Sequence, residues 1–210
     1  LALGLPISFT ILAETSLFAA ASLMIGTIGT IELAAHGIAL QLASLAFMIP
    51  LGMAQVATVR IGLAYGRGDM LGVRRAALAV LAVSLCVSVC GSTLFAVMPR
   101  ELGALFLDTR KPDAQAVLDY AVWLIVIAGI FQMADGLQAV GAGMLRGLKD
   151  TKVPMLLALI AYWPIGFACA WLFAFPLGYG GPGVWFGFVT GLGAAAFLLC
   201  GRFYLLVRRA

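Results

Sequence analysis

Residues 117–144 have the sequence VLDYAVWLIVIAGIFQMADGLQAVGAGM, a run of 28 residues that holds only two charged side chains. An α-helix rises about 1.5 Å per residue, and the hydrocarbon core of a bilayer is about 30 Å thick. About 20 consecutive apolar residues are therefore enough to cross a membrane as a helix. The stretch predicts a transmembrane helix, with one acid, Asp135, deep inside it.

The rest of the chain repeats this pattern. Of its 210 residues 63% are hydrophobic and 10% are charged, and the mean hydropathy is +1.09, whereas soluble domains carry about 25% charged residues. We therefore predict an all-α, polytopic membrane protein with six transmembrane helices. The expected helices are 3–28, 34–58, 76–98, 117–144, 153–175 and 184–207.

The domain organisation follows from the short connections between these runs. The longest connection, 99–116, is too short for a polar linker, so residues 1–210 are expected to form one helical domain. The first run is too long for a cleavable signal peptide and no charged leader precedes it. Because the chain also lacks an initiating Met, we expect a fragment whose N-terminal partner is absent. Six helices with both ends on one side are the unit that duplication repeats in parallel.

Positive charge is distributed unequally between the two sets of loops. One set, with the tail from residue 202, holds Arg60, Arg67, Arg74, Arg75, Arg146, Lys149, Lys152, Arg202, Arg208 and Arg209. The other set holds Arg100, Arg110 and Lys111. The positive-inside rule places the richer side, and both chain ends, in the cytoplasm. This topology also accounts for the net charge of +4, so we expect no nucleic-acid partner.

Prolines and glycines inside the runs predict local features of the helices. Pro50 and Pro164 each remove a backbone hydrogen bond, so a bend is expected at each. Gly183, Gly187 and Gly191 recur every fourth residue. This spacing is typical of helices whose backbones approach closely in a membrane.

Enzymatic chemistry is not expected from this composition. His36 is the only histidine, and it falls near the outer boundary of 34–58, where we expect an interfacial hydrogen bond. Without a Ser or Cys partner at the same depth it does not predict a hydrolytic site. The four cysteines lie inside the runs with no histidine or second Cys pair nearby, and are best interpreted as packing residues.

Two carboxylates stand out because a membrane interior disfavours charge. An acid at the centre of a transmembrane helix costs about 2.5–3.5 kcal/mol, and such residues usually face a cavity or a bundle interior. Glu14 lies about 13 residues into the first run, or ~20 Å deep, and Asp135 lies about ten residues, or ~15 Å, before the end of the fourth. Both depths approach the midplane, so we expect the two acids to share one cavity.

The surroundings of these acids favour a positively charged ligand. Polar or adaptable side chains at helical spacing are candidate cavity-lining residues: Thr10, Phe131, Gln138, Gln41, Ser44 and Met48. Oxygen and amide groups suit hard cations. Arg60 and Arg146 lie near helix ends, where they can reach water, so neither is expected to neutralise the acids. Na⁺ and H⁺ remain alternative occupants, since burial raises a carboxylate's affinity for protons. A second interpretation is that each acid is only hydrogen-bonded and serves packing.

Several motifs resemble one transporter family. They are Leu3-Gly4-Leu5-Pro6 with Ala13-Glu14, Ala35-His36-Gly37-Ile38-Ala39-Leu40, Phe131-Gln132-Met133-Ala134-Asp135, Arg146-Gly147-Leu148-Lys149-Asp150-Thr151, Ala161-Tyr162-Trp163 and Gly181-Pro182-Gly183-Val184-Trp185-Phe186-Gly187. Together they resemble the C-terminal half of multidrug and toxic compound extrusion (MATE) transporters of the NorM branch, over essentially all 210 residues.

The resemblance implies a function as well as a fold. It implies the second six-helix lobe of a twelve-helix antiporter in the cell inner membrane, which exports organic cations in exchange for Na⁺ or H⁺ by alternating access. Glu14 and Asp135 match the family's cation-binding acids, and would be metal ligands if the ion is Na⁺. The implied partners are the organic cations, membrane lipid and the N-terminal lobe, with no cofactor beyond the coupling ion. Phe131 departs from the family, which usually has Tyr there.

Two other functions remain as alternatives. A flippase for lipid-linked precursors would need basic residues inside the cavity to meet phosphates, whereas the deep charges here are negative. An intramembrane enzyme would need a nucleophile with its base or a metal cluster. Both are less consistent with the sequence than export of a cationic solute.

Overall fold

The structure is a computed structural model that describes residues 4–107 and 112–209. All of its regular elements are helical. In chain order they are α1 (Gly4–Ile28), α2 (Thr30–Gly66), α3 (Met70–Val97), α4 (Pro99–Ala104), α5 (Ala114–Gly147), α6 (Lys152–Ile160), the π-helix η1 (Ala161–Phe167), α7 (Ala168–Ala174) and α8 (Gly180–Arg209).

Six membrane-spanning helices are present in the described residues, as predicted. They are α1, α2, α3, α5, the continuous run α6–η1–α7, and α8. The short helix α4 forms inside 99–116, which was expected to be a loop. The all-α, multi-pass membrane fold is therefore confirmed.

The second helix is longer than the apolar run that predicted it. It ends at Gly66 instead of residue 58, so most of the expected loop 60–75 is helical. Hydropathy detects only the part of a helix that lies in lipid, and no proline occurs between residue 58 and the turn at 67–69. Asp69 then begins α3, where its carboxylate accepts a hydrogen bond from the Gly72 amide at 2.8 Å.

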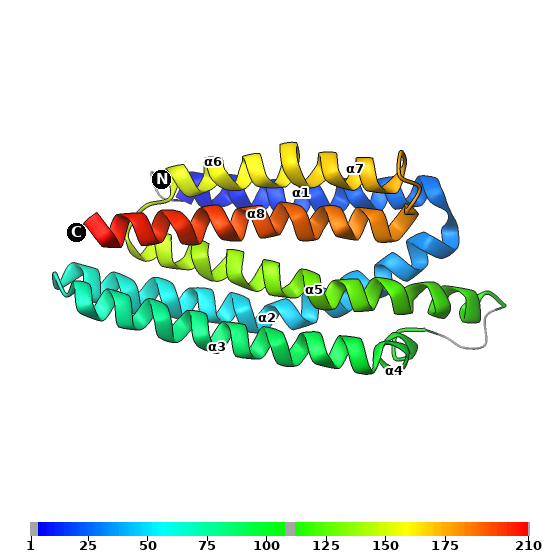
Figure 1. Cartoon of the computed structure of the whole chain (residues 1–210), viewed down its shortest axis with the longest axis horizontal. Helices are drawn as coiled ribbons and strands as arrows, with labels where there is room; N and C mark the ends of the chain where they lie inside the picture. Colours follow the sequence, from blue (N-terminus) through cyan, green and yellow to red (C-terminus); the bar gives the residue numbers. More distant parts are fainter. Residues whose placement is uncertain (1–3, 108–111, 210) are drawn as a thin grey trace.

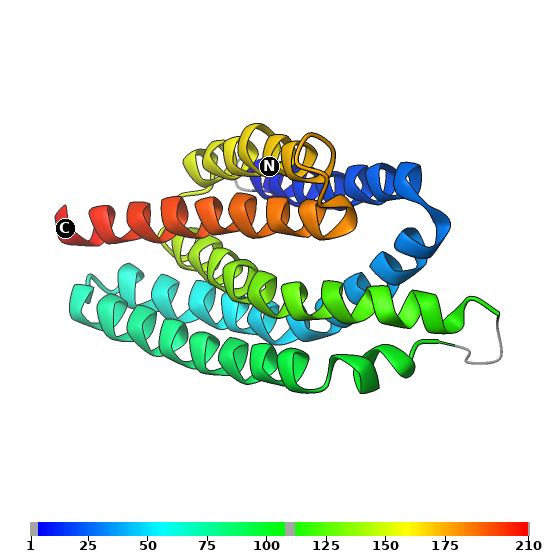
Figure 2. The same ribbon diagram turned by 45° about the vertical axis from the view of Figure 1, so that its right-hand side comes forward.

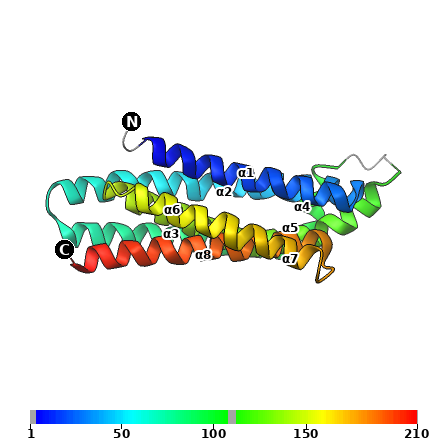
Figure 3. The same ribbon diagram turned by 90° about the horizontal axis from the view of Figure 1, so that it is seen from above.

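The helices form two groups with α5 between them (Figures 1 and 2). One group contains α1, α6–α7 and α8, and the other contains α2 and α3. Helix α5 contacts α2 and α3 on one side and α8 on the other. Seen from above, α6–α7 runs obliquely between α1 and α8 (Figure 3), and it contacts both. Helix α5 is thus placed to carry side chains into the centre of the bundle.

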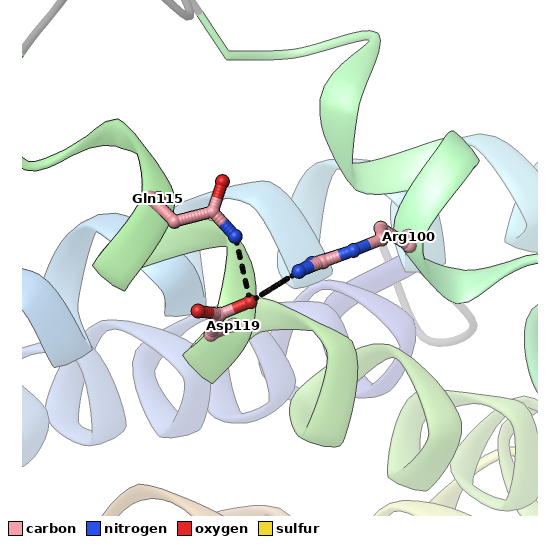
Figure 4. Close-up of polar contacts among 3 residues, drawn as sticks. All are labelled: Arg100, Gln115 and Asp119. Atoms are coloured by element: carbon pink, nitrogen blue, oxygen red, sulfur yellow. Dashed lines mark hydrogen bonds and ion pairs between the residues drawn. The ribbon is translucent and has the colours of Figure 1, made fainter.

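Both chain ends lie at the same end of the bundle (Figure 1). The turn at 67–69 and the connection 148–151 lie there too, so the loops richer in basic residues share one side. The opposite end holds α4, where Arg100 pairs with Asp119 of α5 at 2.5 Å, and Gln115 donates to the same carboxylate at 3.1 Å (Figure 4). Arg110 and Lys111, predicted for that side, lie outside the described residues.

The predicted glycine contacts occur between α8 and the helix beside it. A methyl group at Gly187 would lie 2.3 Å from the Ala170 Cα, and one at Gly191 would lie 2.6 Å from the Gly166 Cα. Both distances are far below van der Waals contact, so only glycine allows these backbones to approach. This contact fixes the position of η1.

Both prolines are associated with irregular helix geometry. Figure 2 shows that α2, which contains Pro50, changes direction along its length. Pro164 lies inside η1, where the backbone widens into a π-helix because proline cannot donate the usual hydrogen bond. The widened turn contains Tyr162, which becomes important at the cavity.

Candidate cation-binding site

A cavity of about 500 Å³ lies between α1, α2, α5 and the beginning of α6. Most of its wall is apolar, as expected for a ligand site inside a membrane protein. Its polar or charged lining residues are Thr10, Glu14, Thr15, Ser44, Gln55, Asp135, Gln138, Arg146, Asp150 and Thr151.

Glu14 and Asp135 are brought together by a shared amide. The Gln138 Nε2 donates to the Glu14 Oε1 at 3.0 Å and to the Asp135 Oδ1 at 3.5 Å. The two carboxylate oxygens are therefore no farther apart than the sum of these distances. Asp135 is buried, with 5% of its surface exposed, while Glu14 is half-buried. The expectation that both acids line one cavity is confirmed.

Tyr162 completes this group from the π-helix. Its hydroxyl donates to the Gln138 Oε1 at 2.9 Å, and the side chain is fully buried. We call Glu14, Asp135, Gln138 and Tyr162 the acid cluster. It joins α1, α5 and η1, and it places two acids against one amide at the cavity wall.

Three other predicted lining residues also reach the cavity. Phe131 lines it with 2% of its surface exposed, and its ring packs edge-on against Phe18 and Trp185 at centroid distances of 6.0 and 5.5 Å. Thr10 lines it while its hydroxyl donates to the Pro6 carbonyl at 2.9 Å. Ser44 lines it from α2. These residues give the site an apolar wall beside the acids.

Gln41 and Met48 do not line the cavity, contrary to the prediction. Both are exposed, and the lining face of α2 contains Leu40, Phe47 and Leu51 instead. A helix turns about 100° per residue. Around the axis of α2, Gln41 and Met48 therefore lie roughly 100° or more from Phe47. The expected stripe therefore overlaps the lining face only at its edge, because Ser44 lines the cavity whereas Gln41 and Met48 do not.

Arg146 was expected to lie at a helix end away from the acids, yet it lines the same cavity. It is in the last turn of α5, and its Nε donates to the Ala142 carbonyl at 3.4 Å. The nearby Asp150 accepts from the Arg202 Nε at 2.6 Å. One wall of the cavity is therefore basic, at the end nearest the chain termini.

His36 is buried, which corrects its predicted interfacial position. It is 1% exposed; its Nδ1 accepts from the Trp185 indole at 3.2 Å, and its Nε2 lies 3.1 Å from the Ser22 Oγ. Because Nδ1 accepts, Nε2 carries the proton of the neutral ring and donates to Ser22. A protonated Nε2 cannot deprotonate Ser22, so this His36 cluster (Ser22, His36 and Trp185) is a structural connection between α1, α2 and α8.

The donor groups present limit how a metal would bind. Within 4–107 and 112–209, no three His, Cys, Asp or Glu side chains converge. A Na⁺ ion at the acid cluster would therefore rely on two carboxylates supplemented by neutral oxygens. Na⁺ is a hard cation for which such oxygens are suitable ligands.

The sequence missed the hydrogen bond of Tyr162 and the position of Arg146. Tyr162 precedes Pro164 by two residues, and a proline inside a transmembrane run is a signal for an irregular turn that redirects side chains. Arg146 carried no comparable signal, because its proximity to the cavity depends on how α5 packs against α1 and α6.

The fold and cavity define an integral membrane protein with six spanning helices and a polar interior. The MatE family model matches residues 6–172, and the chain therefore belongs to the MatE family. The resemblance inferred from the motifs is confirmed.

Relatives and a solved structure agree with this assignment. The chain is 70% identical over 99% of its length to a "Probable multidrug resistance protein NorM" of Rhizobium meliloti, and 62% identical over its whole length to one of Agrobacterium fabrum. It covers 44% and 45% of those proteins, or about half their length. A crystal structure of MATE in the straight conformation matches all of the chain at a TM-score of 0.90 with 20% identity, over 46% of that protein, which supports the fold.

Proposed function

We propose that this chain is the C-terminal lobe of a multidrug efflux antiporter that exports organic cations in exchange for Na⁺ or H⁺. The observation that supports this most is the acid cluster: two carboxylates from α1 and α5 meet at one amide on the wall of an internal cavity. The names of the relatives favour multidrug export. No enzymatic activity is proposed.

The acids would couple the two fluxes through their repulsion. With both ionised, Glu14 and Asp135 repel each other across a low-dielectric space, and a cation between them removes that cost. Binding then favours whichever conformation of the two lobes brings the acids closest to the ion. Only such a difference in affinity between states couples ion entry to drug release.

The energy for export would come from the gradients of the coupling ion. One charge that moves through 100 mV releases about 2.3 kcal/mol, whereas a tenfold gradient of a neutral solute costs about 1.4 kcal/mol. A monovalent cationic drug that leaves the cell consumes the same ~2.3 kcal/mol, so a one-for-one exchange gains no energy from the voltage. The concentration gradient of the coupling ion would then supply the energy.

We further propose the inner membrane as the location, with both ends of the lobe in the cytoplasm. The support is the excess of basic residues at the bundle end that holds the two termini, because basic loops remain on the cytoplasmic side. The N-terminal lobe would pack beside this one and complete the pathway.

Flipping of a lipid-linked phosphate is the second candidate function, and Arg146 is the observation in its favour. A basic residue on the cavity wall is what a phosphate would need. The same cavity is also lined by Glu14 and Asp135, and they would repel an anionic headgroup. Cationic cargo therefore fits the cavity better.

The test is dye efflux by the full-length transporter from dye-loaded, right-side-out membrane vesicles. Na⁺ and pH gradients are imposed separately, and wild type is compared with Glu14→Gln and Asp135→Asn. The matched controls are Glu101→Gln and Asp113→Asn, which neutralise exposed acids outside the cavity. We expect ion-driven efflux to fall in the first two variants and to persist in the controls. Undiminished efflux in Glu14→Gln and Asp135→Asn, or transport of a lipid-linked phosphate instead of dye, would overturn the proposal.

A further inference from the structure

Gln138 presents its amide group to the acids in a single orientation. Its Nε2 faces both carboxylates, and its Oε1 accepts from Tyr162. The reverse orientation would direct the amide oxygen at two carboxylate oxygens and would leave the Tyr162 hydroxyl proton without that acceptor. When the acids are ionised and no cation lies between them, the observed orientation is therefore the one in which each polar atom has a complementary partner.

A metal cation reverses this preference. Na⁺ takes oxygen ligands and is repelled by the hydrogens of an amide NH₂ group. As oriented, the Nε2 of Gln138 occupies the position between the acids that a bound metal ion would need. Rotation of the amide by half a turn would replace this donor with Oε1, and would give the ion a third oxygen ligand from the protein.

Tyr162 opposes that rotation. The Tyr162 hydroxyl donates a hydrogen bond to the Gln138 Oε1 at 2.9 Å, and the side chain is fully buried. Rotation of the amide would leave the buried hydroxyl proton without this acceptor, which is costly away from water. Tyr162 is itself held by the π-helix around Pro164 and by the close contact of Gly166 with Gly191. The ring thus keeps its position, and after rotation its hydroxyl oxygen can accept from Nε2 while the hydroxyl proton loses its acceptor.

We infer that Tyr162 is a positioning residue that sets the affinity for metal ions by fixing the orientation of the Gln138 amide. In that orientation the NH₂ group of Gln138 donates to both acids until a cation displaces it. The inference rests on the proposed function, because it takes Glu14 and Asp135 as the cation ligands. Tyr162 would thus help to determine which ion is bound, although its helix, η1, contributes neither acid.

The variant that isolates this effect is Tyr162→Phe in the full-length transporter. Without the hydroxyl, the atom of the Gln138 amide that faces position 162 has no partner there, whichever way the amide is turned. Rotation of the amide therefore no longer costs a hydrogen bond. We expect the Na⁺ concentration for half-maximal binding to fall about two- to tenfold, the equivalent of one neutral hydrogen bond. The readouts are ²²Na⁺ binding to purified protein and the rise of Tm with Na⁺, neither of which needs transport.

The control is Tyr120→Phe, which removes another bonded tyrosine hydroxyl. The Tyr120 oxygen accepts from the Gly181 amide at 3.0 Å, away from the acid cluster. Its loss should lower Tm without changing the Na⁺ affinity, so a general loosening of the bundle is distinguished from release of the amide.

Two further variants separate the possible outcomes. If Asp135→Asn leaves Na⁺ binding unchanged, the cation site itself is wrong. If Asp135→Asn removes binding while Tyr162→Phe has the wild-type affinity or a weaker one, the inference about the amide is overturned and the site stands. Should Tyr162→Phe fail to fold, Tyr162→Met removes the same hydroxyl with an adaptable apolar side chain, and the same rise in Na⁺ affinity is required of it. Absence of Na⁺ binding in every variant also overturns the inference.

Discussion

The acid cluster and the His36 cluster are both buried polar groups that connect three helices. They differ in how much charge and hydrogen-bonding capacity is left without a partner. In the His36 cluster, the Trp185 indole donates to one ring nitrogen and the other lies against Ser22. No member of it lines the cavity. In the acid cluster, Gln138 offers one NH₂ group to two carboxylates beside an open cavity.

We propose that this difference distinguishes a structural cluster from a cation-binding one. A neutral cluster whose members satisfy one another stabilises the packing and has nothing further to bind. Two acids that share a single donor retain negative charge and lone pairs that only a cation can compensate. The two clusters should therefore respond oppositely to mutation, one in stability and the other in ion coupling.

The largest expected effect is on transport, at the acid cluster. Asp135→Asn should reduce ion-driven dye efflux at least tenfold, because the ion loses a charged ligand. It should leave the Tm unchanged or raise it, because a buried charge is removed. Efflux and thermal unfolding of the full-length protein check both parts. A large fall in Tm with coupling intact would instead mean that Asp135 serves packing.

At the His36 cluster we expect a loss of stability without a change in ion coupling. His36→Leu strands the buried Trp185 N–H, which should cost about 1–3 kcal/mol of stability. The dependence of efflux on ion concentration should not change among the molecules that remain folded. Unfolding in denaturant and the ion titration of efflux are the measurements. A shifted ion titration would place His36 in the coupling mechanism and remove the contrast between the clusters.

A smaller effect is expected at the basic wall of the cavity. Arg146 and Glu14 line the same cavity, so a cation bound at the acids would be repelled by the Arg146 guanidinium. Arg146→Gln should therefore lower the half-saturating cation concentration by up to about fivefold, the range of a partly solvated charge pair. Arg208→Gln, which changes an exposed residue in the last turn of α8, is the control. Weaker cation binding in Arg146→Gln would contradict this interpretation.

The smallest effect is expected from an added oxygen at Phe131. Phe131→Tyr introduces a hydroxyl on the cavity wall and should increase the Na⁺ dependence of efflux about two- to threefold, less than a full hydrogen bond to a charged group. The packing against Phe18 and Trp185 limits the gain. Titration of efflux with Na⁺ at constant pH measures it. An unchanged Na⁺ affinity would remove the idea that the missing Tyr oxygen affects the ion preference.

The sequence predicted the fold and the acid pair because both depend on local properties. Apolar runs fix the spanning helices, and the depth of Glu14 and Asp135 follows from helical rise. Helix ends beyond the lipid were less predictable, as α2 shows, because hydropathy falls before the helix stops. The rotation of a helix about its axis, which excluded Gln41 and Met48, depends on packing with neighbours that a single run does not encode.

Hydrogen bonds between residues far apart in the sequence were not predicted. Gln138 and Glu14 are separated by 124 positions, and Trp185 and His36 by 149. Gln138 was expected to line the cavity, but its shared amide depends on the orientation of three helices. Tyr162 faces it only because η1 is widened around Pro164.

The most direct test of the account is cation binding by the purified full-length transporter, without drug or gradient. Bound ²²Na⁺ and protons taken up on acidification are measured for wild type and for the double variant Glu14→Gln/Asp135→Asn, with Glu101→Gln/Asp113→Asn as the control. We expect wild type and control to bind one of these ions and the double variant to lose that binding. Full ion binding by the double variant would contradict it.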